Sequence, residues 1–252
     1  MTALRTLALA SLAAPLAFAL SGCGSKDDSA PSAAPTGEPI AAVAPPAGQT
    51  WSTVVSATPD GGMRMGNPEA RLKLVEYGSL SCPHCAKLAN DGMETLINKY
   101  VNSGRVSYEF RSFPIHGIID VPLTVMVRCA DPAAFFPLVE QIYTNQPAIM
   151  TRAEAGNDQA QAASQLPPAQ RFPALADAFG LTDWFAARGL AKDQAHACLA
   201  DTSAAERVAK EGQKWSDEGI NQTPMLALNG SILDEVSEWK ELEPVLQNAG
   251  AR

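Results

Sequence analysis

Basic residues are in the minority in this sequence, and long apolar runs are absent from most of it. The 252 residues include 19 Lys and Arg against 27 Asp and Glu, which gives a net charge of −8. Phosphate contacts need clustered Lys and Arg, so we expect no nucleic-acid partner. After the N-terminus, no apolar run reaches the length of about 18 residues that marks a membrane-spanning helix. Hydrophobic residues make up 46% of the chain, which allows a globular core in one or two domains.

One apolar stretch lies at the start of the chain. A single Arg5 precedes an apolar run from Leu7 to Leu20, which is followed by Ser-Gly-Cys. The run is too short to span a membrane and too apolar for a loop, so it predicts an export signal over residues 1–22. The residues Leu-Ser-Gly-Cys resemble the lipobox of bacterial lipoproteins, which implies cleavage before Cys23 and a lipid on its thiol. The alternative is an ordinary signal peptide in which Cys23 is incidental.

The next segment is typical of a tether. From Gly24 to Thr50 the residues are mainly Ala, Pro, Ser and Gly, and none is aromatic. Such a segment buries too little apolar surface to offset its ordering entropy, so residues 23–50 are predicted to be a disordered linker. A flexible chain of this length reaches about 30 Å. We therefore expect a folded part that begins near Trp51 and is held off a bacterial membrane by its lipid.

The five cysteines are an odd number, which usually leaves one thiol to be explained. If Cys23 carries a lipid, Cys82, Cys85, Cys129 and Cys198 remain. An exported protein meets oxidising conditions, so the four thiols favour two disulfide pairs.

A strand, a helix and a second strand surround the segment Cys-Pro-His-Cys at 82–85. Residues 70–80 are apolar and β-favouring, residues 82–104 place apolar side chains at helical spacing, and residues 105–114 alternate in polarity. A right-handed crossover would make the two strands parallel. The pattern therefore predicts a βαβ unit.

The strand signal then disappears between residues 118 and 201, where short Ala-rich helical patterns follow one another. Residues 202–219 predict a longer helix, and residues 223–233 predict two strands joined by an Asn-Gly turn. The predicted fold class is α/β. Residues 51–117 and 202–252 would form one domain, and residues 118–201 a helical insertion within it.

The Cys-Pro-His-Cys segment has the features of a reactive thiol site. Cys82 lies at the predicted helix N-terminus, where unpaired N–H groups and the helix dipole favour the thiolate that attacks disulfides. Pro83 suits the first helical turn, and His84 places a donor or a positive charge beside the sulfur. Cys85, one turn along, can close on Cys82 and resolve a mixed disulfide.

Together with Thr223-Pro224, which begins a predicted strand, this segment resembles the DsbA-like branch of the thioredoxin superfamily. The resemblance covers the whole folded part and implies a thioredoxin-like fold with a helical insertion. In that superfamily the matching proline is cis and lies against the active-site disulfide, and the residue before it pairs with the incoming peptide. The family prototype has an aliphatic residue where Thr223 stands, which leaves the oxidising strength open.

The resemblance also implies roles for other residues. Glu76 matches the buried acid that assists proton exchange at the second cysteine, although it could instead be a solvent-facing strand residue. Some DsbA-like proteins have a second disulfide, which here would join Cys129 and Cys198. The alternative for these two is a pair of buried free thiols.

Metal binding is the main rival interpretation of the thiols. A zinc site normally needs four ligands, and neither His116 nor His196 has a suitable spacing, so we expect no metal. A copper carrier is chemically sensible, because soft sulfur ligands select copper. Its ligands would be Cys82, Cys85, Met63, Met65 and Met225. A purely structural disulfide between Cys82 and Cys85 is a further alternative.

The favoured hypothesis is a periplasmic thiol:disulfide oxidoreductase, most similar to a DsbA-like oxidase. It would exchange disulfides with reduced exported proteins, and an unidentified membrane redox partner would restore it. No cofactor is expected, because the two sulfurs carry the electrons. The linker leaves no room for an N-terminal dimerisation domain, which favours a monomer. A reductase for a narrow client remains the alternative within the class.

Overall fold

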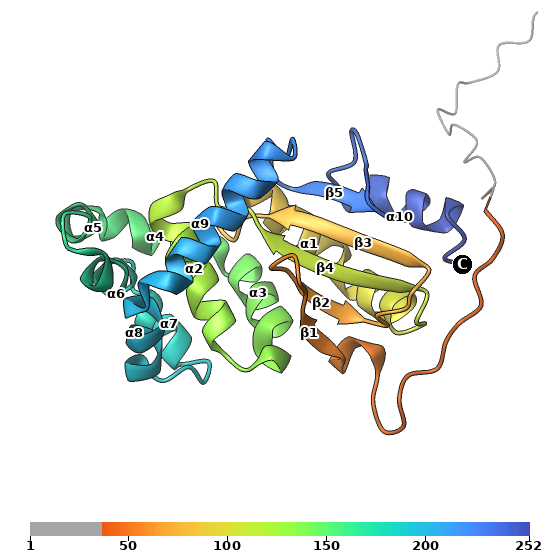
Figure 1. The fold of residues 1–252 in the computed structure, drawn as a ribbon, viewed down its shortest axis with the longest axis horizontal. Coiled ribbons are helices and arrows are strands. Elements are labelled where there is room, and N and C mark those ends of the chain that lie inside the picture. The colour runs from red at the N-terminus through yellow and green to blue at the C-terminus, as the bar shows by residue number, and fades with distance from the viewer. Residues whose placement is uncertain (1–36) are drawn as a thin grey trace, which may run out of the picture. The chain divides into compact units, whose positions relative to one another are not determined.

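A six-stranded mixed sheet forms the centre of the described part of the molecule. The computed structural model describes residues 37–252. The strand order is β1-β2-β4-β3-β5-β6 (Figure 1). The strands are β1 (Val55–Ala57), β2 (Met63–Gly66), β3 (Leu72–Gly78), β4 (Val106–Ser112), β5 (Met225–Leu228) and β6 (Ser231–Ile232). Only β3 and β4 are parallel, and every other neighbouring pair in this sheet is antiparallel.

The predicted βαβ unit is confirmed. The connection between β3 and β4 is α1 (Pro83–Thr95), which continues as a π-helical segment over Leu96–Val101. Its apolar stripe, including Leu88 and Tyr100, is buried in the main hydrophobic core. The Asn-Gly turn between β5 and β6 also forms, with Asn229 and Gly230 both at positive φ, as a tight two-residue hairpin requires.

The helical insertion lies at the end of the sheet where β3 and β4 finish (Figure 1). Its helices are α2 (Gly117–Cys129), α3 (Phe135–Thr144), α4 (Gln146–Ala155), α5 (Asn157–Ala163), α6 (Pro168–Ala178), α7 (Leu181–Ala186) and α8 (Lys192–Ala200). Helix α2 is buried along most of its length and packs against α6, α8 and α9 (Thr202–Asp217). The fold class predicted from the sequence, α/β with inserted helices, is confirmed.

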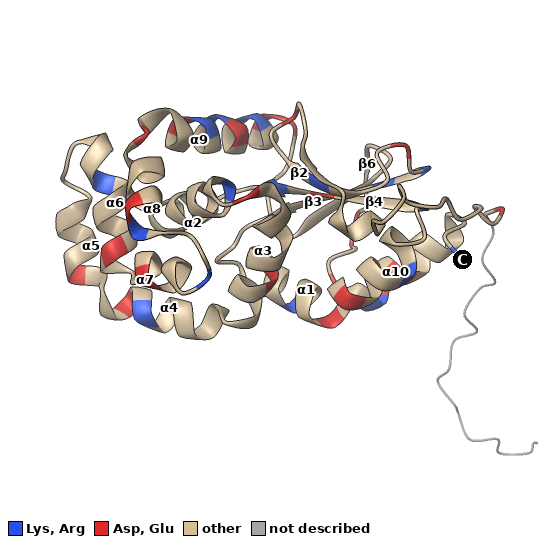
Figure 2. Cartoon of the chain, turned by 90° about the horizontal axis from the view of Figure 1, so that it is seen from below, with Lys and Arg blue, Asp and Glu red and all other residues tan. Residues whose placement is uncertain are grey.

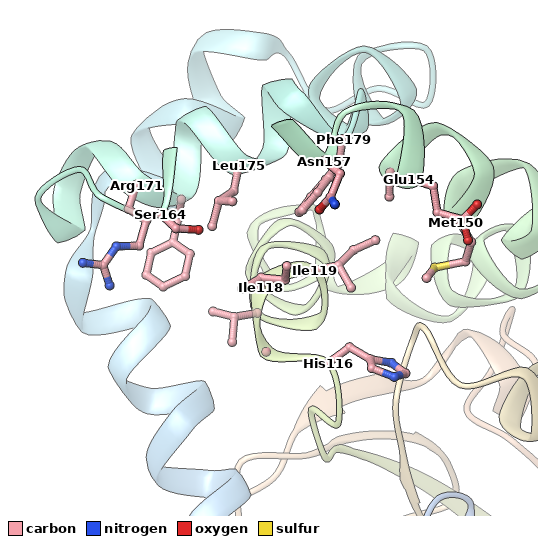
Figure 3. Close-up of a pocket in the computed structure, with 14 residues that line it drawn as sticks. His116, Ile118, Ile119, Met150, Glu154, Asn157, Ser164, Arg171, Leu175 and Phe179 are labelled. Carbon is pink, nitrogen blue, oxygen red and sulfur yellow. The ribbon is translucent and has the colours of Figure 1, made fainter. Parts of the chain in front are cut away.

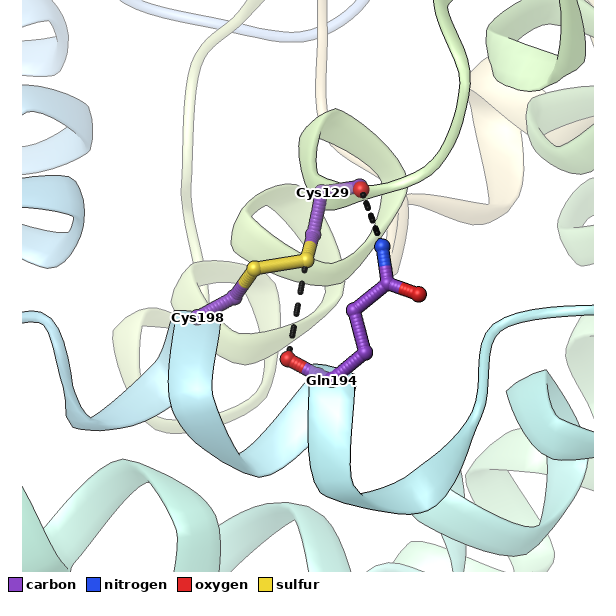
Figure 4. Close-up of a disulfide and its surroundings, with 3 residues drawn as sticks. All are labelled: Cys129, Gln194 and Cys198. Carbon is purple, nitrogen blue, oxygen red and sulfur yellow. Dashed lines mark hydrogen bonds between the residues drawn. A yellow bond between two sulfur atoms is a disulfide. The ribbon is translucent and has the colours of Figure 1, made fainter.

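A disulfide joins two helices of the insertion (Figure 4). Cys129, the last residue of α2, is bonded to Cys198 of α8, and their Cα atoms are 6.2 Å apart. The Gln194 side chain, one turn earlier on α8, donates a hydrogen bond to the Cys129 carbonyl oxygen at 3.3 Å. These contacts connect the end of α2 to α8 across 69 residues of sequence.

The folded part begins before Trp51, which is earlier than predicted from the sequence. Residues 37–50 have no regular secondary structure, yet Ile40 is buried and its carbonyl oxygen accepts a hydrogen bond from Arg105. Farther along, the Val43 carbonyl oxygen accepts one from the Trp51 indole. The composition of the segment obscured these contacts, because one buried isoleucine among prolines and alanines gives no periodic signal. The signal segment 1–22 and Cys23 lie outside the described residues.

Charges of both signs are interspersed on the surface. Figure 2 shows Lys and Arg alternating with Asp and Glu along α9, where Lys210 and Glu206 form an ion pair one turn apart. In the part of the chain from residue 37 onward, no helix combines the length and the apolar character needed to cross a membrane.

The last helix, α10 (Trp239–Asn248), packs directly on α1 through a glycine. A Cβ atom added at Gly92 would lie 2.3 Å from the Trp239 ring. The absence of a side chain at this position therefore sets how closely the two helices approach.

We expect Gly92→Ala to lower the free energy of unfolding by about 1–3 kcal/mol, because the added methyl overlaps an aromatic ring inside a packed interface. Urea denaturation measures this change. The control is Gly117→Ala, since a Cβ there meets no atom within 4 Å. Equal stability of the two variants would contradict the close packing of α1 and α10.

Candidate active site

Cys82 lies at the junction between a tight turn and the start of α1. It is the residue that caps the helix N-terminus, and Pro83 occupies the first turn. Its N–H donates to the Ser79 carbonyl oxygen at 3.2 Å, and its own carbonyl oxygen accepts the first helical hydrogen bond from Ala86. Pro83 and His84 are exposed, whereas only 3% of Cys82 is exposed. The sulfur therefore sits at the positive end of the helix with little contact to water.

The segment before β5 lies against Cys82. The Thr223–Pro224 peptide bond is cis. The Cys82 Sγ is 3.3 Å from the Thr223 carbonyl oxygen, to which the sulfur donates a hydrogen bond when it is protonated. The Thr223 hydroxyl oxygen is also buried. Cys82 and the segment before β5 are thus in contact, although 141 residues of sequence separate Cys82 from Thr223.

The two thiols of the site have opposite acidities. A hydrogen bond from the Cys85 thiol, with further ones from Thr223 and from the backbone of Cys85 and His84, lowers the pKa of Cys82 to about 5. Burial raises the pKa of Cys85 well above its usual value, and the neighbouring Cys82 sulfur raises it further. At neutral pH, Cys82 is therefore the thiolate and Cys85 the thiol.

Glu76 is buried beside this pair on β3. Only 1% of it is exposed, and the Tyr108 hydroxyl donates to its Oε2. Its Oε1 has no hydrogen-bond partner among the described residues. Burial raises the pKa of Glu76 to about 7, and Cys85 lies close enough for each group to affect the pKa of the other. A carboxyl group with this pKa can give or take a proton near neutral pH.

Several polar residues around the site have no recognisable signal in the sequence. His116, for which the sequence indicated no role, has its Nδ1 2.8 Å from the Ser81 hydroxyl, directly before Cys82. Asp120, on α2, accepts hydrogen bonds from both Ser79 and Ser81. A serine on each side of Leu80 was the only local signal, and it does not identify partners about 40 residues away.

The structure separates the candidate copper ligands. Met63 and Met65 are buried on β2, while Met225 begins β5, and strands β4 and β3 lie between them. Strands are spaced about 4.8 Å apart, so the three thioethers do not converge. His196 pairs with Asp177 at 2.9 Å, far along the insertion. Within residues 37–252, no three His, Cys, Asp or Glu side chains are grouped as a metal site.

A cavity of about 700 Å³ opens beside the site, among α2, α4, α5 and α6. Figure 3 shows Ile118, Ile119, Leu175 and Phe179 lining it, with His116 at one edge. Its walls are mainly apolar, and His116 is the residue that connects it to the turn before Cys82.

Comparisons with known proteins agree with this architecture. The family model described as Thioredoxin matches residues 58–248. A protein-disulfide isomerase from Novosphingobium aromaticivorans, known from its crystal structure, is 26% identical with a TM-score of 0.68, over 73% of this chain and 94% of that one. Wolbachia pipientis alpha-DsbA1 is 17% identical with a TM-score of 0.60, over 80% of this chain and 96% of that one.

Curated relatives match a shorter region. A Rickettsia bellii protein, named provisionally as a protein-disulfide oxidoreductase, is 31% identical over 84 residues. The matched region is 33% of this chain, and it spans about a third of the relative's length. The resemblance to the DsbA-like branch is confirmed at the level of the fold. Since the family model covers most of the sequence, the chain belongs to the thioredoxin family.

Proposed function

We propose that this protein is a periplasmic thiol:disulfide oxidoreductase that acts mainly as an oxidase of exported proteins. The observation that carries the proposal is the contrast between the two thiols. Cys82 has its pKa lowered to about 5 at a helix N-terminus, and the neighbouring Cys85 has its pKa raised by burial. A stabilised thiolate makes the reduced pair favourable, and a favourable reduced pair makes the disulfide a strong oxidant.

The exchange balances without a cofactor. A client thiolate attacks Cys82 Sγ of the Cys82–Cys85 disulfide, which forms a mixed disulfide and releases Cys85 as a thiolate. The second client thiolate then attacks the client sulfur of the mixed disulfide and releases Cys82 as a thiolate. The client loses two electrons and gains a disulfide, and the enzyme is left with two reduced sulfurs. A membrane redox partner would remove these electrons by the reverse exchange.

Glu76 would transfer protons to and from the Cys85 sulfur. Because the pKa of Cys85 lies well above its usual value, its thiolate must be protonated promptly when it leaves. Glu76 is the buried acid beside it, with a pKa of about 7. It can therefore deliver a proton during oxidation of the client and accept one when the disulfide is restored.

Client binding would use the segment before β5. The Thr223 backbone lies against Cys82 and precedes a strand, so an extended peptide could pair with it as a short added strand. Its hydroxyl also lowers the pKa of Cys82. Anchoring through Cys23 would keep the enzyme at a bacterial membrane, near newly exported chains, and the chain would act as a monomer.

The reduction potential of the Cys82/Cys85 pair tests the direction of exchange. We expect a value near that of DsbA-type oxidants, about −120 mV, rather than the value of about −270 mV found for thioredoxin. Equilibration of the full chain carrying Cys23→Ser with glutathione buffers measures it. Cys129 and Cys198 are replaced together in a control. A thioredoxin-like value would instead favour the reductase alternative.

Cys82→Ser should abolish catalysed oxidative refolding of a reduced disulfide protein, because no other described thiol combines a lowered pKa with a disulfide partner. The rate of disulfide formation in the client is the measurement. The paired replacement of Cys129 and Cys198 should retain catalysis. Refolding that continues unchanged in Cys82→Ser would rule out this site.

Glu76→Gln should change how stability depends on pH. The folded state raises the pKa of Glu76 from 4.5 to about 7, so ionisation destabilises the folded protein as the pH rises through this interval. The reduced variant should therefore gain about 3 kcal/mol over the wild type between pH 4 and pH 8. Urea denaturation across this range is the measurement. Parallel pH profiles of wild type and variant would contradict the raised pKa.

A further inference from the structure

The turn that leads into Cys82, residues 79–82, receives several hydrogen bonds from outside its own domain. Five of its polar groups have hydrogen-bond partners on the helical insertion. They are Ser79 Oγ, Ser81 N–H and the carbonyl oxygens of Ser79, Leu80 and Cys82. The partners are Asp120 of α2, Tyr143 of α3 and Gln146 of α4. All three are buried.

Asp120 gathers donors from two segments. Its carboxylate accepts from the Ser79 hydroxyl at 3.0 and 2.9 Å and from the Ser81 N–H at 3.0 Å. It also accepts from the N–H groups of Ile115 and His116, both at 2.9 Å, just before α2. These donors satisfy the oxygens of a carboxylate that is buried away from water. Asp120 therefore joins the turn to the residues that lead into α2.

Gln146 reaches Cys82 itself. Its Nε2 donates to the Leu80 carbonyl oxygen at 2.9 Å and to the Cys82 carbonyl oxygen at 3.1 Å. The Tyr143 hydroxyl, from the preceding helix, donates to the Ser79 carbonyl oxygen at 3.2 Å. Gln146 is the first residue of α4, so the helix holds its backbone in place. Its side chain reaches across the turn to both carbonyl oxygens.

We propose that Gln146, Asp120 and Tyr143 are positioning residues, through which the helical insertion fixes the Cys82 sulfur against the N-terminus of α1. The proposal rests on the proposed function of this site. It gives the insertion a role in the reaction, since the insertion supplies contacts that set where the reactive Cys82 sulfur lies.

The physical basis is the narrow range of the helix-terminus effect. Unpaired N–H groups and the helix dipole act on a sulfur only within the first turn, and hydrogen bonds weaken steeply with angle. The backbone of His84 and Cys85 contributes to the lowered pKa of Cys82. If the turn relaxes, the sulfur moves away from these groups and the thiolate is less favoured.

Gln146→Met and Asp120→Asn test this directly. The first keeps the length of the side chain but removes both donors. Asp120→Asn keeps the shape of the side chain. Its amide group, however, places a donor next to hydroxyl and N–H groups that are themselves donors. Each should raise the midpoint of the pH profile of Cys82 alkylation by about one unit, which is a tenfold change in the ionisation constant. The full chain is measured in the Cys23→Ser background, with mass spectrometry to identify the alkylated thiol.

Thr182→Val is the matched control. It removes one partly buried hydrogen bond within the same insertion, from the buried Thr182 to Asp177, and it leaves the turn unchanged. It should lower stability but leave the alkylation midpoint unchanged. Tyr143→Phe removes a single hydroxyl and keeps the ring, so it supplies the same test, with a smaller shift, if the other variants fail to fold.

The proposal is overturned if the variants that fold have the wild-type midpoint, or if Thr182→Val shifts it equally. These outcomes would assign the three residues to stability alone. The test does not depend on client turnover. If the wild-type protein refolds no client, the proposed function fails, while the alkylation profile still decides whether the insertion positions the sulfur.

Discussion

This structure depends on one constraint. The Cys82 sulfur carries a negative charge although it has little contact with water. Cys82 is 3% exposed, Cys85 is fully buried and Glu76 is 1% exposed. Burial alone would raise the pKa of all three groups, and it does so for Cys85 and Glu76. Cys82 is the exception because hydrogen-bond donors gather around its sulfur. Hydrogen-bond donors thus gather on one sulfur, while the pKa values of Cys85 and Glu76 remain raised.

Those polar groups come from segments far apart in the sequence. The start of α1 supplies its N–H groups, the loop before β5 supplies Thr223, and the insertion holds the turn through Asp120 and Gln146. The insertion follows β4, the strand next to β3, so its first helices begin at the end of the sheet where the turn lies (Figure 1). The site therefore requires the sheet, the helix and the insertion to be folded together.

The sequence alone predicted the parts of this site that have strong local signals. The Cys-Pro-His-Cys segment at a helix start, the Asn-Gly turn and the alternating strands each depend on neighbouring residues, and the structure contains all of them. The strands β1 and β2 were missed because three and four residues are too few to show a period. Gln146 was missed for a different reason. Its partners lie 64 and 66 residues away, and one glutamine in a helical pattern does not indicate what it contacts.

The same burial couples the carboxyl group of Glu76 to the thiols. The Cys82 thiolate raises the pKa of Glu76, so by reciprocity an ionised Glu76 makes the thiolate less favourable. With a pKa of about 7, Glu76 is mostly neutral below that pH and leaves the thiolate stable, whereas above it the two negative charges compete. In the proposed reaction, thiolate stability would set how strongly the disulfide oxidises a client, so the buried acid would contribute to the redox balance as well as to proton transfer. A polar residue in place of Glu76 would keep the packing and lose this dependence on pH.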